Sequence, residues 1–329
     1  MNTVLLTHLT TLSLLSANPA PEPVGSVNRI DDSLDRLLAP EAKLERIAEG
    51  FEWAEGPVWD KENARLLFSD VPENTVYSWS EEEGLAVYLK PSGFTGPVSL
   101  SREPGSNGLA FDARGQLLSC EHGDRRLSTL TPSGGKMTLA DNYEGKRFNS
   151  PNDLAVHSSG SLFFTDPPYG LPGGAQSEFK ELDHQGVYRL DPDGSVTLLI
   201  ADLPRPNGVT LSPDEKTLYI AQSHRPAPHI LAYPINADLG LGKGSLLFDA
   251  SDLAGQYAGS PDGLKCDREG NIWSTGPGGV LIITPDGKLL GHLLTGRRTA
   301  NLAWGDDGKT LYLTADSDLL RIRTLVGGW

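Results

Sequence analysis

A sequence pattern that occurs six times at blade-length spacing predicts an all-β protein folded as a six-bladed β-propeller. Each copy has a polar residue, a short apolar run, a turn and a second apolar run, as in SNGLAFDARGQLLS and PNDLAVHSSGSLFF. The residue that opens each copy defines position zero, which falls at Glu55, Asn107, Asn152, Asn207, Asp262 and Ala300. The intervals are 52, 45, 55, 55 and 38 residues, and they bracket the roughly 40–50 residue period of propeller blades.

The turn inside each copy supports the same phase. Four copies have a glycine eight residues after position zero, at Gly115, Gly160, Gly270 and Gly308, and Glu215 takes this place in a fifth copy. A glycine there supplies the positive φ of a hairpin turn. Parallel β-solenoids have much shorter periods, helical repeats require a helical pattern that this chain lacks, and a β-sandwich leaves the regular spacing unexplained.

The N-terminal region precedes the repeats and is expected to have two parts. Residues 1–20 contain an apolar stretch, Val4 to Leu15, followed by small residues and prolines, which predicts a signal peptide and export to the periplasm or the medium. The alternative is a plain N-terminal extension of a cytoplasmic protein, because the stretch has no preceding Lys or Arg. Residues 21–43 are expected to be a linker with a helical turn or two from Asp31 to Leu38, and residues 44–329 to form the propeller.

Composition limits the partners of the protein. The formal net charge is −15, so no basic stripe is available for nucleic acid, and no segment reaches the roughly 20 apolar residues that span a membrane. Cys120 and Cys266 have no zinc-site spacing, and their different repeat positions predict two separate buried thiols rather than a disulfide. The sequence does not predict an oligomeric state.

The position-zero residues are the strongest functional signal. The innermost strand of each propeller blade lines the central channel, so these residues are expected to form a ring around the axis. Five of the six side chains carry oxygen and two of these are carboxylates, which suits a hard cation such as Ca²⁺ that takes six to eight oxygen ligands. The ring contains neither His nor Cys, which disfavours zinc or copper. The alternative is that Asn-Gly and Asp-Gly pairs are ordinary turn residues, and their recurrence in one phase favours the metal.

Five short motifs resemble the gluconolactonase / senescence marker protein (regucalcin) family, and one of them, CEHGDRR, resembles its bacterial gluconolactonase branch. The motifs are EGPVW from Glu55, CEHGDRR from Cys120, RFNSPND from Arg147, TDPPYG from Thr165 and PNGV from Pro206. The resemblance runs from about Leu44 to the C-terminus. It implies one divalent cation, usually Ca²⁺, held by Glu55, Asn152, Asn207 and Asp262, with Mg²⁺, Mn²⁺ or Zn²⁺ as possible substitutes.

The resemblance also implies an activity, the hydrolysis of a sugar (aldono) lactone such as D-glucono-1,5-lactone to the aldonic acid. The cation would polarise the lactone carbonyl, and Asp262 is the candidate general base, although a metal-bound carboxylate is a weak base. The candidate substrate-binding residues are Asn107, Glu121, His122, Arg147, Asn149 and Tyr169. Two alternatives stay open: a phosphotriesterase-type hydrolase on the same metal site, and a non-catalytic propeller that binds a partner and holds a structural ion.

Overall fold

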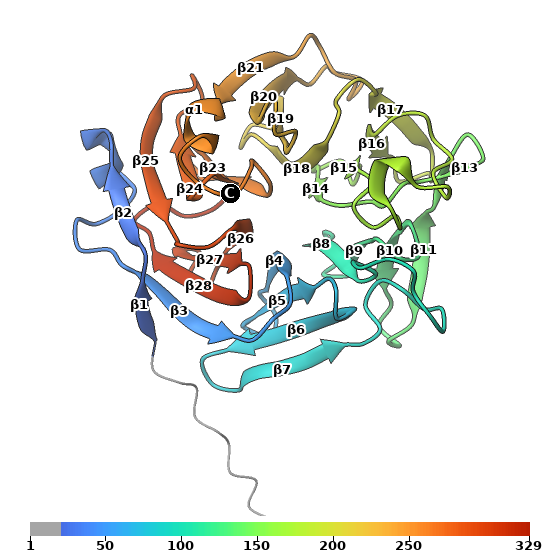
Figure 1. Ribbon diagram of the computed structural model, residues 1–329, viewed down its shortest axis with the longest axis horizontal. Helices are drawn as coiled ribbons and strands as arrows, with labels where there is room; N and C mark the ends of the chain where they lie inside the picture. Colours follow the sequence, from blue (N-terminus) through green and yellow to red (C-terminus); the bar gives the residue numbers. More distant parts are fainter. Residues whose placement is uncertain (1–20) are drawn as a thin grey trace, which may run out of the picture.

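Six antiparallel sheets surround a common centre in the computed structural model, which describes residues 21–329 (Figure 1). The predicted six-bladed β-propeller is therefore confirmed. The signal-peptide prediction concerns residues 1–20 and lies outside the described residues. Within the described part of the chain, no helix is long and apolar enough to cross a membrane.

Blades 1 to 5 each have four consecutive strands, which follow one another outward from the centre. Blade 1 contains β4 (Ala54–Asp60), β5 (Arg65–Asp70), β6 (Thr75–Ser80) and β7 (Gly84–Leu89). Blade 2 contains β8 (Ser106–Phe111), β9 (Leu117–Glu121), β10 (Arg126–Leu130) and β11 (Lys136–Ala140). Blade 3 contains β14 (Leu154–Val156), β15 (Leu162–Asp166), β16 (Gly186–Leu190) and β17 (Val196–Ile200), and the hairpin β12 (Asn142–Tyr143) and β13 (Lys146–Arg147) precedes it.

Blade 4 follows the same plan, and blades 5 and 6 also include strands from the N-terminal segment. Blade 4 contains β18 (Pro206–Leu211), β19 (Thr217–Gln222), β20 (His229–Pro234) and β21 (Ser245–Asp249). Blade 5 contains β22 (Leu264–Cys266), β23 (Ile272–Gly276), β24 (Gly279–Ile283) and β25 (Leu289–Leu294), and helix α1 (Ser251–Ala254) precedes it. Blade 6 contains β26 (Thr299–Gly305), β27 (Thr310–Ala315), β28 (Asp318–Arg323) and, from the start of the chain, β3 (Leu44–Glu49).

The N-terminal segment closes the ring. Strand β3 pairs with β28, so the first and last parts of the propeller share blade 6. Residues 21–30, expected to be linker, instead form β1 (Glu22–Val24) on the edge of β3 and β2 (Ser26–Arg29) on the edge of β25. Strands β3 and β25 would otherwise be edge strands with unpaired backbone N–H and C=O groups, and β1 and β2 form hydrogen bonds with these groups. Val24 and Val27 also pack against the hydrophobic core.

The expected helical turn is present as the 3₁₀ helix η1 (Asp32–Arg36). The carboxylate of Asp31 caps it by accepting a hydrogen bond from the Ser33 N–H at 3.0 Å. Leu34, Leu37 and Leu38 are buried in the core of blades 5 and 6, as their shared face predicts. A second 3₁₀ helix, η2 (Gly174–Gln176), lies in the loop between β15 and β16.

The innermost strands explain why a polar residue at position zero is often followed by glycine. Pairing is interrupted by a bulge at or beside this position in β4, β8, β18 and β26. The glycine that follows does not form a turn but allows two inner strands to approach, since a Cβ on Gly56 would lie 2.0 Å from the Asn107 carbonyl oxygen and one on Gly208 2.1 Å from that of Asp262. The hairpin turn comes later, where Glu215 adopts a φ of 55° in place of the glycine of other copies.

Both cysteines are buried and unpaired, as expected, in β9 and β22.

Candidate functional site

A small pocket at the centre of the ring brings the five polar position-zero residues together. Its volume is about 220 Å³, and its lining includes Glu55, Asn107, Asn152, Asn207 and Asp262. The inner ends of the blades supply them, and β4, β8, β14 and β18 lie nearest the centre in Figure 1. This volume is below the roughly 300–1,000 Å³ of drug-sized ligand sites, so it suits a small polar molecule.

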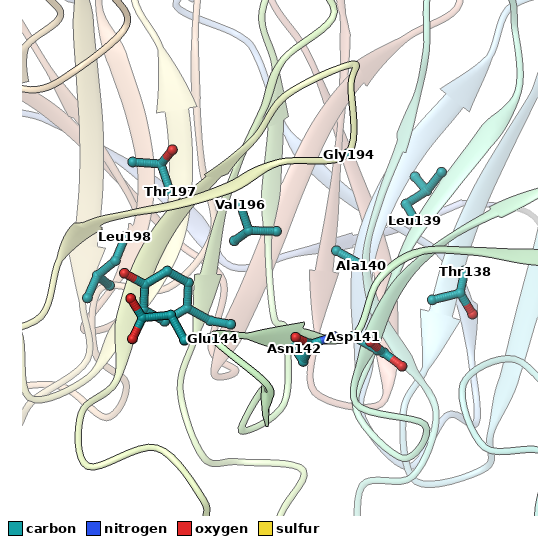
Figure 2. A pocket seen from close by; sticks show the side chains of 11 residues that line it. Thr138, Leu139, Ala140, Asp141, Asn142, Glu144, Gly194, Val196, Thr197 and Leu198 are labelled. Carbon is teal, nitrogen blue, oxygen red and sulfur yellow. Dashed lines mark hydrogen bonds between the residues drawn. The ribbon is translucent and has the colours of Figure 1, made fainter.

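A larger hollow of about 520 Å³ lies between β11 and β17, at the outside of blades 2 and 3 (Figure 2). Figure 2 shows its side chains spread along these strands and the adjoining hairpin rather than directed to one point. Asp141 and Glu144 are its only carboxylates, and no position-zero residue reaches it. The axial pocket is therefore the better candidate, because buried polar groups from several blades converge there.

Two buried carboxylates define the electrostatics of the axial pocket. Glu55 accepts hydrogen bonds from the Trp53 indole N–H and the Gly56 N–H, both at 3.2 Å. Burial raises the pKa of Asp262, and the nearby charge of Glu55 raises it further. Burial also raises the pKa of Glu55. Carboxylates in such a place favour either protonation or a bound cation, which would hold both of them ionised.

The amide oxygens of the ring fit a hard cation. Asn107 and Asn207 are buried, and among residues 21–329 no donor faces the Oδ1 atom of either one. The Asn207 Nδ2 atom donates to the Ser223 hydroxyl at 2.8 Å, which leaves its Oδ1 directed elsewhere. A buried carbonyl oxygen without a donor is costly, so a cation is a suitable partner for these atoms. Residues 21–329 contain no group of three or more His, Cys, Asp or Glu that could hold a metal, so the candidate site depends on these amides.

Tyr169 and Ser223 form one wall of the pocket. The Ser223 hydroxyl donates to the Pro261 carbonyl at 2.6 Å, directly before Asp262. Burial raises the pKa of Tyr169 to about 12, and its phenol is hydrogen-bonded to Ser223. This network connects blades 3, 4 and 5 and fixes the orientation of the Asn207 amide.

Glu103 also lines the pocket, whereas His122 is buried next to Asn152 and is not among the lining residues. His122 is fully buried, with Nε2 3.5 Å from Asn152 Nδ2 and Nδ1 3.8 Å from Glu103 Oε2. Burial lowers the pKa of His122 to about 4, so its imidazole is neutral near pH 7. Burial raises the pKa of Glu103 to about 7, and this carboxyl lines the pocket without belonging to the ring.

Residues 53–317 match the family model described as SMP-30/Gluconolactonase/LRE-like region. The chain belongs to this family. The gluconolactonase of Zymomonas mobilis is 40% identical over 313 residues, which cover 93% of this chain and 88% of the relative. The pentonolactonase XacC of Haloferax volcanii is 26% identical over 264 residues, 79% of this chain and 80% of the relative. A solved gluconolactonase from Xanthomonas campestris is 31% identical with a TM-score of 0.81, and the match covers 93% of this chain and 98% of that one.

Four residues expected to bind substrate in this member of the gluconolactonase family do not line the pocket: His122 and the three that follow. Glu121 is buried in ion pairs with Arg126 at 2.7 Å and Lys136 at 2.6 Å. The Arg147 guanidinium donates to the Asp124 carbonyl at 2.5 Å. The Asn149 side chain donates to the carbonyls of Asp166 and His184, at 2.9 and 3.0 Å. Each side chain is engaged in holding a loop or a blade.

Several pocket residues lie outside the motifs that point to the gluconolactonase family. Glu103, Ser223, Arg205, Arg225 and Arg298 line the pocket, although none stands at position zero. They come from the connections between strands, where the repeat pattern does not extend. Only Arg205 had a nearby sequence signal, because it directly precedes the PNGV motif.

Proposed function

We propose that this protein is a calcium-dependent lactonase that hydrolyses a sugar lactone, such as D-glucono-1,5-lactone, to the aldonic acid. The observation that carries the proposal is the convergence of two buried carboxylates and two amide oxygens without donors on one small axial pocket. The 40% identity to a gluconolactonase over nearly the whole chain supports the same chemistry.

The ring residues would hold the cation. Glu55 and Asp262 supply two negative charges, and Asn152 and Asn207 supply amide oxygens, a donor set suited to Ca²⁺. When bound, the cation would act as a Lewis acid toward the lactone carbonyl and stabilise the negative charge that develops on its oxygen. Asn107 has a free amide oxygen in the same pocket and is placed to accept a hydrogen bond from a sugar hydroxyl.

The proton of the attacking water requires a base, and two carboxylates of the pocket are candidates. Asp262 is the first, but the cation would engage it and lower its basicity. Glu103 lies in the same pocket outside the proposed ligand set, and its pKa of about 7 suits proton transfer near neutrality. The neutral His122 lies beside Glu103, with Nδ1 3.8 Å from Oε2. The Tyr169 phenol already shares its hydrogen with Ser223, so its oxygen would accept a hydrogen bond from a sugar hydroxyl.

The first test is initial-rate hydrolysis of D-glucono-1,5-lactone in a pH-stat, after EDTA treatment and again after Ca²⁺ is restored. We expect activity to disappear with EDTA, to return with Ca²⁺ and to be absent from Asp262→Ala. Folded, calcium-loaded protein without activity on sugar lactones would refute the proposal. Hydrolysis of phosphotriesters instead would establish the phosphotriesterase alternative, and calcium binding with no hydrolysis would establish the binding platform.

We also propose that the protein acts outside the cytoplasm. The apolar stretch from Val4 to Leu15, followed by small residues, supports this location. N-terminal sequencing of the protein from the periplasm or medium is expected to find a start near residue 21, and a full-length chain in the cytoplasm would contradict export.

A further inference from the structure

Three arginines line the axial pocket without a carboxylate partner. Arg205 and Arg225 come from blade 4, just before β18 and between β19 and β20, and Arg298 comes from the connection that enters β26 of blade 6. Within residues 21–329, none of the three makes an ion pair or donates a side-chain hydrogen bond, in contrast to Arg65, which pairs with Asp60 at 3.0 Å. All three are exposed, so they lie where the pocket opens to solvent and their charges are available to a ligand.

Among residues 21–329, the three arginines form no ion pair with the pocket carboxylates Glu55, Glu103 and Asp262. Burial alone accounts for the raised pKa of Glu103, with no cation opposing it. The groups that act most strongly on Asp262 are other carboxylates and the Asn207 amide, and no arginine is among them. The guanidinium carbon of Arg205 lies over the Tyr169 ring, 6.0 Å from its centre. The positive charges therefore face the pocket without an internal counterion.

The pocket thus has two chemically different parts. Its carboxylate and amide ring suits a cation and the reacting carbonyl, whereas the exposed arginines from blades 4 and 6 suit an anion. Guanidinium groups bind carboxylates and phosphates through paired, charge-assisted hydrogen bonds. A volume of about 220 Å³ brings both parts within the span of one small molecule.

We infer that the substrate of this site is a sugar lactone carrying an anionic group, a carboxylate or a phosphate, which is bound by Arg205, Arg225 and Arg298. The inference rests on the proposed lactonase function and specifies its substrate class. The anionic group would lie at the end of the sugar away from the carbonyl, since Glu55, Asp262 and the amides occupy the axis.

The test compares two matched pairs of lactones with the calcium-loaded full-length protein. D-Glucono-1,5-lactone is compared with its 6-phosphate, and D-glucono-1,4-lactone with D-glucaro-1,4-lactone, so each pair differs in one anionic group. We expect kcat/KM to be at least about tenfold higher for the anionic member of one pair, the size of a single charge-assisted contact. The pair that shows the preference identifies phosphate or carboxylate as the recognised group.

Variants Arg205→Gln, Arg225→Gln and Arg298→Gln connect the preference to these residues. Each is expected to lower the anionic-to-neutral ratio of kcat/KM by about tenfold, whereas Arg36→Gln, an exposed arginine outside the pocket, leaves the ratio unchanged. Calorimetric binding of 6-phosphogluconate, glucarate and gluconate is a second measurement that does not depend on turnover. The preferred anion should bind about tenfold more weakly to each pocket variant.

Two results would overturn the inference and leave the lactonase proposal standing: equal kcat/KM within both pairs, or losses in the arginine variants that are the same for neutral and anionic lactones. In the second case the arginines would serve only as donors to sugar hydroxyls. Failure of the lactonase proposal is a separate outcome, because no lactone would then be hydrolysed at all. Equal binding of gluconate, which carries only the C1 carboxylate, and of the two ligands that carry a second anionic group would refute the inference even then.

Discussion

Replacing Glu121 with glutamine should destabilise the protein and spare its activity. The Glu121 carboxylate is fully buried, pairs with Arg126 at 2.7 Å and Lys136 at 2.6 Å, and accepts from the Ser128 hydroxyl. Removing its charge leaves the largely buried Lys136 without a carboxylate partner, while Arg126 keeps Asp124 at 3.2 Å. Breaking a buried ion pair in this way costs about 3–5 kcal/mol. With an unfolding entropy of about 2.1 cal/mol/K per residue, this corresponds to a decrease in Tm of about 4–7 °C for a chain of this length.

The assay for this prediction is thermal unfolding followed by circular dichroism, together with kcat and KM for lactone hydrolysis at 25 °C. Activity should stay within about twofold of wild type, because Glu121 does not line the axial pocket. Glu41→Gln changes an exposed carboxylate and is the matched control for loss of charge. A large decrease in activity with an unchanged Tm would refute the reasoning and return Glu121 to the substrate-binding residues.

Three further predictions concern the axial pocket. Asp262→Asn should weaken Ca²⁺ binding by at least about tenfold in calorimetry, since one of two charged ligands is lost; unchanged affinity would remove Asp262 from the ligand set. The kcat/KM of wild type should rise as pH increases through about 7, where Glu103 loses its proton. Glu103→Gln should lower kcat and remove this rise of kcat/KM with pH. A pH profile that is the same in wild type and variant would exclude Glu103 as the base. In EDTA, the folded protein holds protons on Glu55, Asp262 and Glu103 that the unfolded chain releases at the ordinary pKa values of 4.5 for Glu and 3.8 for Asp. The Tm should therefore fall as pH rises from about 5 to 8, and Ca²⁺ should flatten this dependence; a Tm that rises in EDTA would contradict the raised pKa values.

Repetition allowed the sequence to determine the architecture and the centre of the candidate site. Because every blade reuses one strand–turn–strand pattern, the phase of position zero was enough to place five polar residues around one axis, and the pocket contains all five. The apolar face of Leu34, Leu37 and Leu38 likewise predicted the buried helical turn η1. These features follow from the regular spacing of polar and apolar residues along strands and helices, which can be read from a single sequence.

Only the tertiary structure showed which other parts of the chain complete the propeller and its axial pocket. Strands β1 and β2 have weak patterns of their own and form because blades 5 and 6 offer open edges. Glu103, Ser223 and the three arginines reach the pocket from connections of irregular length, while Glu121, Arg147 and Asn149 turn to partners of their own. The conformation of a loop depends on contacts far away in the sequence and has no period, so its side chains could be located only in the folded protein.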